Sequence, residues 1–142
     1  MKKYQENLQI TQADTTDYSE LEEVGGNLYV YSNADLKNLK SVGGYLYVYS
    51  NVDFKAPLLK SVGGYLSVYS NADLKNLKSV GGYLYVYSNV DFKAPLLKSV
   101  GGYLSVYSNA DLKNLKSVGG YLYVYSNVDF KAPLLKSVGG DL

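Results

Sequence analysis

The side chains that could carry chemistry in this sequence of 142 residues are Tyr, Asp, Glu, Lys, Asn and Ser, because it contains no His, Cys or Trp. Without Cys and His there are no thiolate or imidazole groups for catalysis, no disulfides, and none of the usual ligands of zinc, haem or iron–sulfur clusters. The serine of a recurring Tyr-Ser-Asn motif has no neighbouring base except Asp or Lys, so it is not a nucleophile. We therefore expect no enzymatic activity, no cofactor and no metal.

An Asp-x-Lys pair recurs along the chain, and its copies are Asp35/Lys37, Asp53/Lys55, Asp73/Lys75, Asp91/Lys93, Asp111/Lys113 and Asp129/Lys131. If the repeats stack as strands, like charges lie ~4.8 Å apart. An Asp column beside a Lys column would relieve that repulsion, with each pair contributing well under ~1 kcal/mol. A catalytic Asp–Lys pair is the alternative, but so many identical copies favour a structural role.

Two other motifs are expected to form corners. Asn51 has equivalents at positions 33, 71, 89, 109 and 127, where an Asn ladder would bond backbone groups of a turn; glycan or metal binding is the alternative. Gly-Gly pairs begin at 25, 43, 63, 81, 101, 119 and 139, and none belongs to a phosphate-binding or calcium-binding glycine motif. We expect these glycines to provide positive φ at tight corners.

Tyrosine is the unusual feature, with 17 residues in the chain. Alternation along the predicted strands places most of them on one face, in three columns. Column one is Tyr45, Tyr65, Tyr83, Tyr103 and Tyr121; column two is Tyr29, Tyr47, Tyr85 and Tyr123, interrupted by Ser67 and Ser105; column three is Tyr31, Tyr49, Tyr69, Tyr87, Tyr107 and Tyr125. These ladders are explained either by β-propensity and cross-strand packing alone, or by a functional surface.

Composition also bears on partners. The net charge is +1 and no Arg is interleaved with the aromatic residues, so we expect no nucleic-acid partner. No apolar run approaches the ~20 residues of a membrane helix, so we expect no membrane partner. The segment from Met1 to Thr11 has no signal-peptide core, and the absence of Cys leaves the compartment open.

The elements that would hold these residues come from an internal repeat. The spacings between Gly-Gly pairs alternate between 18 and 20 residues, which makes a unit of 38 residues, and residues 41–78 are identical to residues 79–116. Natural duplications drift, so this identity indicates either a very recent duplication or an engineered consensus repeat, of which we favour the second. A period of this kind is typical of a solenoid.

Each coil is expected to contain one good strand and one short one. Tyr45–Ser50 alternates between apolar and aromatic residues, with Leu46 and Val48 on one face. The inward columns are predicted to be Leu46, Val48, Phe54, Leu59, Val62 and their equivalents. Short coils have Leu74 where long ones have Phe54, and they lack two residues around Ala56-Pro57.

The sequence thus predicts an all-β, right-handed parallel β-solenoid of about seven coils with alternating lengths of 18 and 20 residues. Residues 1–24 are expected to form an N-terminal capping coil, with two Lys against six acidic residues, a net of −4. Residues 25–142 are expected to form the repeats, without a C-terminal cap. We expect self-association through that uncapped edge or through the tyrosine face.

The pattern across residues 25–142 resembles leucine-rich-repeat solenoids. Leu84-Tyr85-Val86-Tyr87-Ser88-Asn89 matches L-x-L-x-x-N, and the V-G-G-x-L-x-V element from Val80 to Val86 is similar to receptor L-domain repeats. The resemblance implies a right-handed solenoid with a parallel sheet that binds proteins or glycans. Two departures are the coil lengths, at or below the usual lower limit, and the apolar Phe92 three residues after the Asn instead of two.

Together these observations predict a non-enzymatic, designed repeat scaffold that displays tyrosine ladders on a flat sheet. The alternative is a piece of a surface protein whose tyrosine face binds a linear glycan or a protein.

Overall fold

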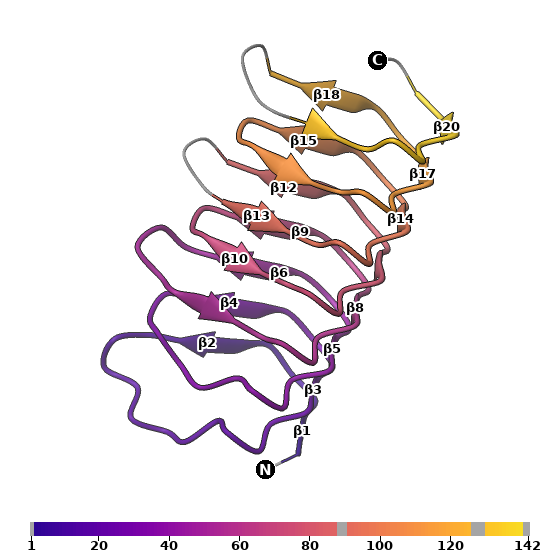
Figure 1. Ribbon diagram of the computed structural model, residues 1–142. Helices are drawn as coiled ribbons and strands as arrows, with labels where there is room; N and C mark the ends of the chain where they lie inside the picture. The colour runs from indigo at the N-terminus through magenta and orange to yellow at the C-terminus, as the bar shows by residue number, and fades with distance from the viewer. Residues whose placement is uncertain (1, 88–90, 126–129, 141–142) are drawn as a thin grey trace.

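Short strands stacked into three parallel sheets make up the fold, as seen in a computed structural model that describes residues 2–87, 91–125 and 130–140 (Figure 1). The described residues form no helix. The chain is therefore an all-β solenoid, as the alternating sequence pattern predicts.

From residue 43 onward each full coil contributes one strand to each sheet, whereas the first two coils contribute none to sheet C. Sheet A contains β1 (Lys3–Tyr4), β3 (Glu23–Val24), β5 (Ser41–Val42), β8 (Ser61–Val62), β11 (Ser79–Val80), β14 (Ser99–Val100), β17 (Ser117–Val118) and β20 (Ser137–Val138). Sheet B contains β2 (Leu8–Ile10), β4 (Leu28–Val30), β6 (Leu46–Val48), β9 (Leu66–Val68), β12 (Leu84–Val86), β15 (Leu104–Val106) and β18 (Leu122–Val124). Sheet C contains β7 (Phe54–Lys55), β10 (Ala72–Asp73), β13 (Phe92–Lys93), β16 (Ala110–Asp111) and β19 (Phe130–Lys131).

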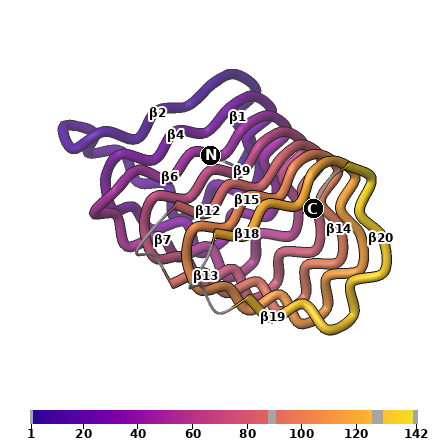
Figure 2. The backbone as a smooth tube through the Cα atoms, turned by 90° about the horizontal axis from the view of Figure 1, so that it is seen from above, coloured from indigo at the N-terminus to yellow at the C-terminus, as the bar shows by residue number. Residues whose placement is uncertain are grey.

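The winding is right-handed. In Figure 1 the strands of sheet C run to the right in front, those of sheet B run to the left behind, and the chain climbs from the N-terminus to the C-terminus. Seen from above, the coils lie over one another as a column (Figure 2). Sheet B has seven strands, so about six turns separate its first strand from its last, which roughly matches the predicted number of coils.

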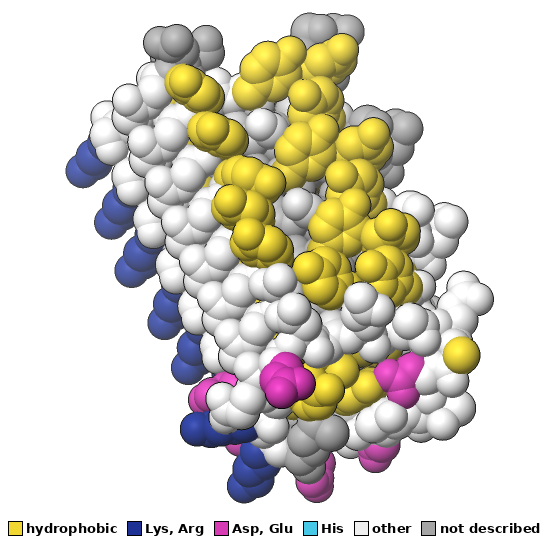
Figure 3. All heavy atoms as spheres, turned by 180° about the vertical axis from the view of Figure 1, so that it is seen from behind, with side chains coloured by type: hydrophobic (Ala, Val, Ile, Leu, Met, Phe, Trp, Pro, Cys, Tyr) yellow, Lys and Arg dark blue, Asp and Glu magenta, His cyan; other side chains and the backbone are white. Residues whose placement is uncertain are grey.

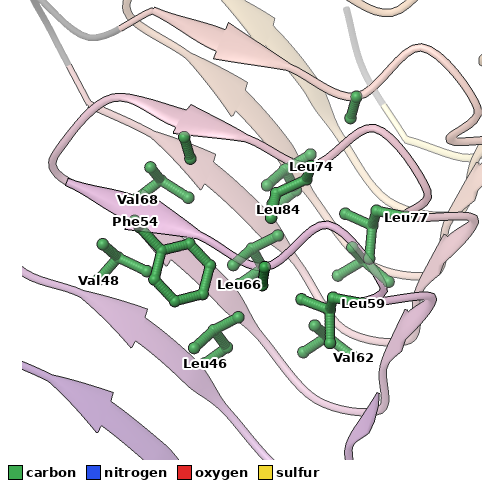
Figure 4. Close-up of a cluster of buried hydrophobic side chains, with 14 of the residues drawn as sticks. Leu46, Val48, Phe54, Leu59, Val62, Leu66, Val68, Leu74, Leu77 and Leu84 are labelled. Carbon is green, nitrogen blue, oxygen red and sulfur yellow. The ribbon is translucent and has the colours of Figure 1, made fainter. Parts of the chain in front are cut away.

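The core fills the space between the three sheets (Figure 4). Leu46, Val48 and Leu59 have no exposed surface, while Val62 and Phe54 are 1% and 2% exposed. The inward columns predicted from the sequence are therefore confirmed up to Leu122, whereas Val124 at the C-terminal end of sheet B is 37% exposed. Burial of this size contributes roughly 1.5–3 kcal/mol for each large apolar side chain, so the inward columns hold each coil against its neighbours.

Sheet C has a register that the sequence pattern did not reveal. Ala72 pairs with Phe54 on one side and Phe92 on the other, so the inward column alternates between large and small side chains. The sequence pattern predicts Leu74 in the position of Phe54, and this prediction is wrong, because Ala72 takes that position. The two extra residues of a long coil lie between β6 and β7, where five residues connect Val48 to Phe54 and only three connect Val68 to Ala72 in the short coil, and not around Ala56-Pro57.

The same register corrects the predicted charge columns. Asp73 pairs with Lys55 and Lys93, and Asp111 pairs with Lys93 and Lys131. These five residues form one outward row of alternating charge, which we call the alternating ladder, in place of an Asp column beside a Lys column. Opposite charges on directly facing strand positions stabilise a sheet, whereas like charges destabilise it. Asp129 lies outside the described residues.

The Gly-Gly corners need glycine for a reason other than positive φ. No described glycine has a positive φ, and the described residue that does is Asn51, at 64°. A Cβ on Gly63 would lie 2.3 Å from the carbonyl oxygen of Gly43, and one on Gly81 would lie 2.3 Å from that of Gly63. Neighbouring coils thus approach too closely at this corner for any side chain.

A buried serine of the following short coil hydrogen-bonds the turn after sheet B in the long coils that contain Tyr49 and Tyr87. Ser70 is 6% exposed, and its Oγ donates a hydrogen bond to the carbonyl oxygen of Tyr49 at 2.5 Å. The same Oγ accepts a hydrogen bond from the backbone N–H of Val52 at 3.0 Å. Ser108 donates in the same way to the carbonyl oxygen of Tyr87. The Tyr-Ser-Asn serine therefore has a structural role in short coils.

The predicted Asn ladder is present in part. Asn33 Oδ1 accepts a hydrogen bond from the backbone N–H of Asp53, and Asn71 Oδ1 accepts one from Asp91. Asn51 instead adopts the left-handed conformation, which Asn tolerates better than most residues. Asn89 and Asn127 lie outside the described residues.

The first coil joins the same sheets. Leu8 and Ile10 pair with Leu28 and Val30 in sheet B, and β1 pairs with β3 in sheet A. Its own buried aromatic residue is Tyr18, whose hydroxyl donates to Asp14 Oδ2 at 2.5 Å. This hydrogen bond lowers the pKa of Asp14.

Candidate functional site

The tyrosine face is the outer surface of sheet B and the residues flanking it (Figure 3). Because Leu46 and Val48 point into the core, Tyr47 between them must point out. All fifteen tyrosines of the three predicted columns are exposed or half-buried, with exposed fractions that reach 52% at Tyr121. The structure thus has tyrosine ladders on the surface of the solenoid.

Column one is a continuous stack of parallel rings. The ring centroids of Tyr45 and Tyr65 lie 4.3 Å apart with an interplanar angle of 5°, and those of Tyr65 and Tyr83 lie 3.7 Å apart at 12°. The stack continues through Tyr103 to Tyr121 at 5.7 and 5.2 Å. We call these five residues the stacked column. Its rings cover one another's faces and therefore offer mainly edges and hydroxyl groups to solvent.

Columns two and three are not separate, because they merge into one band. Tyr69 lies 5.1 Å from Tyr47, 6.2 Å from Tyr85 and 4.4 Å from Tyr87, measured between ring centroids. Ser67, two residues earlier in the same coil, leaves the room for this bridging position. Tyr107 bridges the next two long coils in the same way. The band, which we call the zigzag band, consists of Tyr29, Tyr31, Tyr47, Tyr49, Tyr69, Tyr85, Tyr87, Tyr107, Tyr123 and Tyr125.

The serines of column two therefore shape the face. Beside each serine, the tyrosine of the short coil lies close to the column-two tyrosines of the neighbouring coils. Figure 3 shows the result as two bands of aromatic side chains with a strip between them. The sequence indicated a gap at Ser67 and Ser105, but the merging of two columns depends on side-chain directions that alternation alone does not define.

Crowding changes the acidity of several phenols. Burial, followed by the charge and hydroxyl of Tyr107, raises the pKa of Tyr85 to about 12. Burial and the Tyr69 hydroxyl raise the pKa of Tyr47, and burial together with Tyr65 raises that of Tyr83. For the exposed Tyr45, the hydrogen-bonding partner Tyr65 is the main cause of a raised pKa. These phenols stay protonated at neutral pH and can donate hydrogen bonds from the face.

Sheet C carries two shallow hollows over its small inward residues. One is lined by Lys55, Asp73, Lys93 and the neighbours of Ala72, and the other surrounds Ala110. Their rims belong to the alternating ladder, where opposite charges face each other. Asp53 and Asp91 also line the first hollow, which therefore has three carboxylates against two lysines, and the second hollow has two of each. The charges of each hollow thus nearly cancel.

No group of three or more acidic side chains within the described residues is arranged to hold a metal ion. In the part of the chain that the structure describes, no helix is long and apolar enough to cross a membrane.

Comparison with known proteins gives no relative. No family model, no curated protein and no solved structure matches the chain.

Proposed function

We propose that the chain is a non-enzymatic repeat scaffold of engineered consensus type, built on a leucine-rich-repeat-like plan, that displays ordered tyrosines. The identity of residues 41–78 with residues 79–116 supports the engineered origin. The L-x-L-x-x-N pattern on the strands of sheet B supports the plan. In such a scaffold the core carries the fold, and the outer face is free to hold a chosen side chain.

The observation that carries the proposal is the continuity of the two aromatic groups. The stacked column runs from Tyr45 to Tyr121, and the zigzag band runs from Tyr29 to Tyr125 without a missing ring contact. If the tyrosines only packed against one another across strands, isolated pairs would be enough, each contributing about 0.2–1 kcal/mol. An unbroken array from β4 to β18, six of the seven strands of sheet B, is what a display surface would need.

The proposal is tested by removing tyrosines from the face while the core residues stay unchanged. In one variant Tyr47, Tyr85 and Tyr123 are changed together to Ser, which copies the residue of the short coils. We expect the far-UV circular dichroism to be retained, a loss of about 1–3 kcal/mol in the free energy of unfolding, and a large loss of the near-UV tyrosine signal. Collapse of the fold would mean that the tyrosines are structural and would contradict the scaffold proposal.

A second candidate function is binding through the zigzag band. Its rings are tilted by 27–48° against one another in most contacts, which leaves ring faces partly open, whereas the stacked column covers its own. Open aromatic faces are the part of the surface that suits a linear neutral glycan, a protein, or a second copy of the chain. Titration with a cello-oligosaccharide and measurement of solution mass against concentration test these partners. The triple Ser variant should weaken whichever contact is observed.

A further inference from the structure

A single file of lysines runs along one edge of the molecule and is separate from the tyrosine face. Its members are Lys40, Lys60, Lys78, Lys98, Lys116 and Lys136, which we call the lysine ridge. Backbone hydrogen bonds join each to the next: the N–H of Lys60 donates to the carbonyl oxygen of Lys40, and that of Lys78 to Lys60. All six side chains are exposed, and Figure 3 shows a row of Lys side chains along this edge.

The ridge is not neutralised by the protein. Lys40 pairs with Glu22 at 2.7 Å, but within the described residues no acidic group lies within ion-pair distance of the other five lysines. This differs from the alternating ladder, where Lys55 and Lys93 each face Asp73 across the strands. Like charges on directly neighbouring strands destabilise a sheet. The ridge thus has a lysine in every coil with another lysine beside it, whereas the lysines of the ladder lie two coils apart with an Asp between them.

The geometry of the ridge suits a linear polyanion. Adjacent coils lie ~4.8 Å apart, so six lysines cover roughly 24 Å in one straight line. A chain of anionic groups laid along this line would replace the mutual repulsion of the lysines with attraction. It would also release the counterions condensed on the polyanion, which favours binding at low salt.

The surroundings of the ridge favour an acidic polysaccharide over other polyanions. Next to the lysines lie the half-buried serines of sheet A, such as Ser61 and Ser79, then the bare Gly-Gly corner and the hydroxyls of the stacked column. Rows of hydroxyl groups can hydrogen-bond sugar hydroxyls. Single-stranded nucleic acid needs open aromatic faces for base stacking, and the stacked column covers its faces. A membrane surface would need a broad cationic area instead of one file.

We propose that the lysine ridge is a binding site for a linear acidic polysaccharide, with one lysine per coil contacting carboxylate or sulfate groups. The site does not depend on the proposed role of the tyrosines, because none of its lysines belongs to that face.

The test compares two triple variants of the whole chain. One removes ridge lysines (Lys78→Gln, Lys98→Gln, Lys116→Gln), and the control removes ladder lysines (Lys55→Gln, Lys93→Gln, Lys131→Gln). Both change the net charge from +1 to −2, so they differ only in the position of the lost charges. Thermal unfolding of each variant establishes that the exposed substitutions leave the fold intact.

Binding is measured by fluorescence anisotropy with a labelled heparin fragment at about 50 and 200 mM salt. We expect the ridge variant to bind at least about tenfold more weakly, with a salt dependence shallower by about 0.7 per lysine removed. The ladder variant should stay within about twofold of the unaltered protein.

Three results would overturn the proposal. The first is that heparin does not bind at the lower salt concentration, and the second is that the two variants lose affinity equally. The third is that labelled single-stranded oligo(dT) binds the ridge as tightly as heparin does. A neutral dextran fragment of the same length serves as the control for the anionic groups and should not bind.

Discussion

At the scale of single residues, Ser70 shows how one position can have different roles in coils of different length. The motif Tyr-Ser-Asn is the same in both coil types, yet Ser70 is buried and Ser50 is exposed. The reason is that a long coil has a longer turn after sheet B, and Ser70 of the next coil provides the two hydrogen bonds that this turn needs.

We expect Ser70→Ala to destabilise the protein by about 1–3 kcal/mol, because it leaves the carbonyl of Tyr49 and the N–H of Val52 buried without partners. The matched control is Ser50→Ala, which should change the free energy of unfolding by less than about 0.5 kcal/mol. Denaturant unfolding measures both. Equal effects of the two substitutions would contradict the role assigned to Ser70.

Phenols of the zigzag band make the stability of the fold decrease at alkaline pH. A folded-state pKa of about 12 at Tyr85, against about 10 in an unfolded chain, means that the fold favours the neutral phenol. The resulting stabilisation is complete below about pH 10 and is lost as the pH rises through about 12. Tyr47 acts in the same direction.

We therefore expect the free energy of unfolding to fall between about pH 10 and pH 12. The absorbance of phenolate should appear at a higher pH in the folded protein than in the protein unfolded by denaturant. Tyr85→Phe should reduce this loss, because it removes an ionising group and keeps the ring. If every phenol titrates near pH 10 in the folded protein and stability does not change, the crowding argument is wrong.

At the scale of elements, the sequence predicts the strands and the inward columns well and the register of sheet C poorly. Alternation with a period of two defines which face Leu46 and Phe54 take, and a slip of one residue would expose the core. A slip of two residues keeps every face unchanged. Pairing Phe54 with Leu74 or with Ala72 therefore satisfies the pattern equally.

What distinguishes the two registers is complementarity between neighbouring coils. In the observed register a large side chain lies next to a small one, and Lys lies next to Asp. The position of the extra turn residues follows from this pairing. The zigzag band could not be predicted for a related reason, since the lean of Tyr69 depends on the room beside Ser67.

We expect Ala72→Phe to be destabilising, because it places a third large ring between Phe54 and Phe92. Overpacking of this kind costs about 1–3 kcal/mol. The comparison is Val62→Ile, which adds one methylene to a column without large-and-small alternation, and the free energy of unfolding is measured for both. A neutral effect of Ala72→Phe would mean that the observed register does not depend on side-chain size.

At the scale of the whole molecule, the unit of the solenoid is the double coil and not the single coil. Long and short coils complement each other in four ways: Phe against Ala, Lys against Asp, a long turn against Ser70, and two columns of tyrosine against a serine gap. In repeat proteins generally, stability is a sum of repeat terms and nearest-neighbour interface terms. Here the interface terms should depend on the order of the coils.

Two deletions separate coil number from coil order. Removing residues 63–100 takes out one short and one long coil and leaves a long coil next to a short one. Removing residues 63–80 takes out only a short coil and brings Phe54 next to Phe92, Lys55 next to Lys93 and Tyr47 next to Tyr85. If stability depended only on the number of coils, the variant with the smaller deletion, which keeps one more coil, would be the more stable of the two.

We expect the opposite order. The variant without residues 63–80 should be less stable than the one without residues 63–100 by about 2 kcal/mol or more, because its new interface combines overpacking with buried groups that lose their partners. Denaturant unfolding followed by circular dichroism gives the two free energies. Raising the salt concentration should recover part of the difference, since screening weakens the Lys55–Lys93 repulsion and leaves the ring overlap unchanged. If the variant without residues 63–80 is instead the more stable one, the coils are interchangeable. The complementarity in sheet C would then be a consequence of the repeated sequence that does not stabilise the fold.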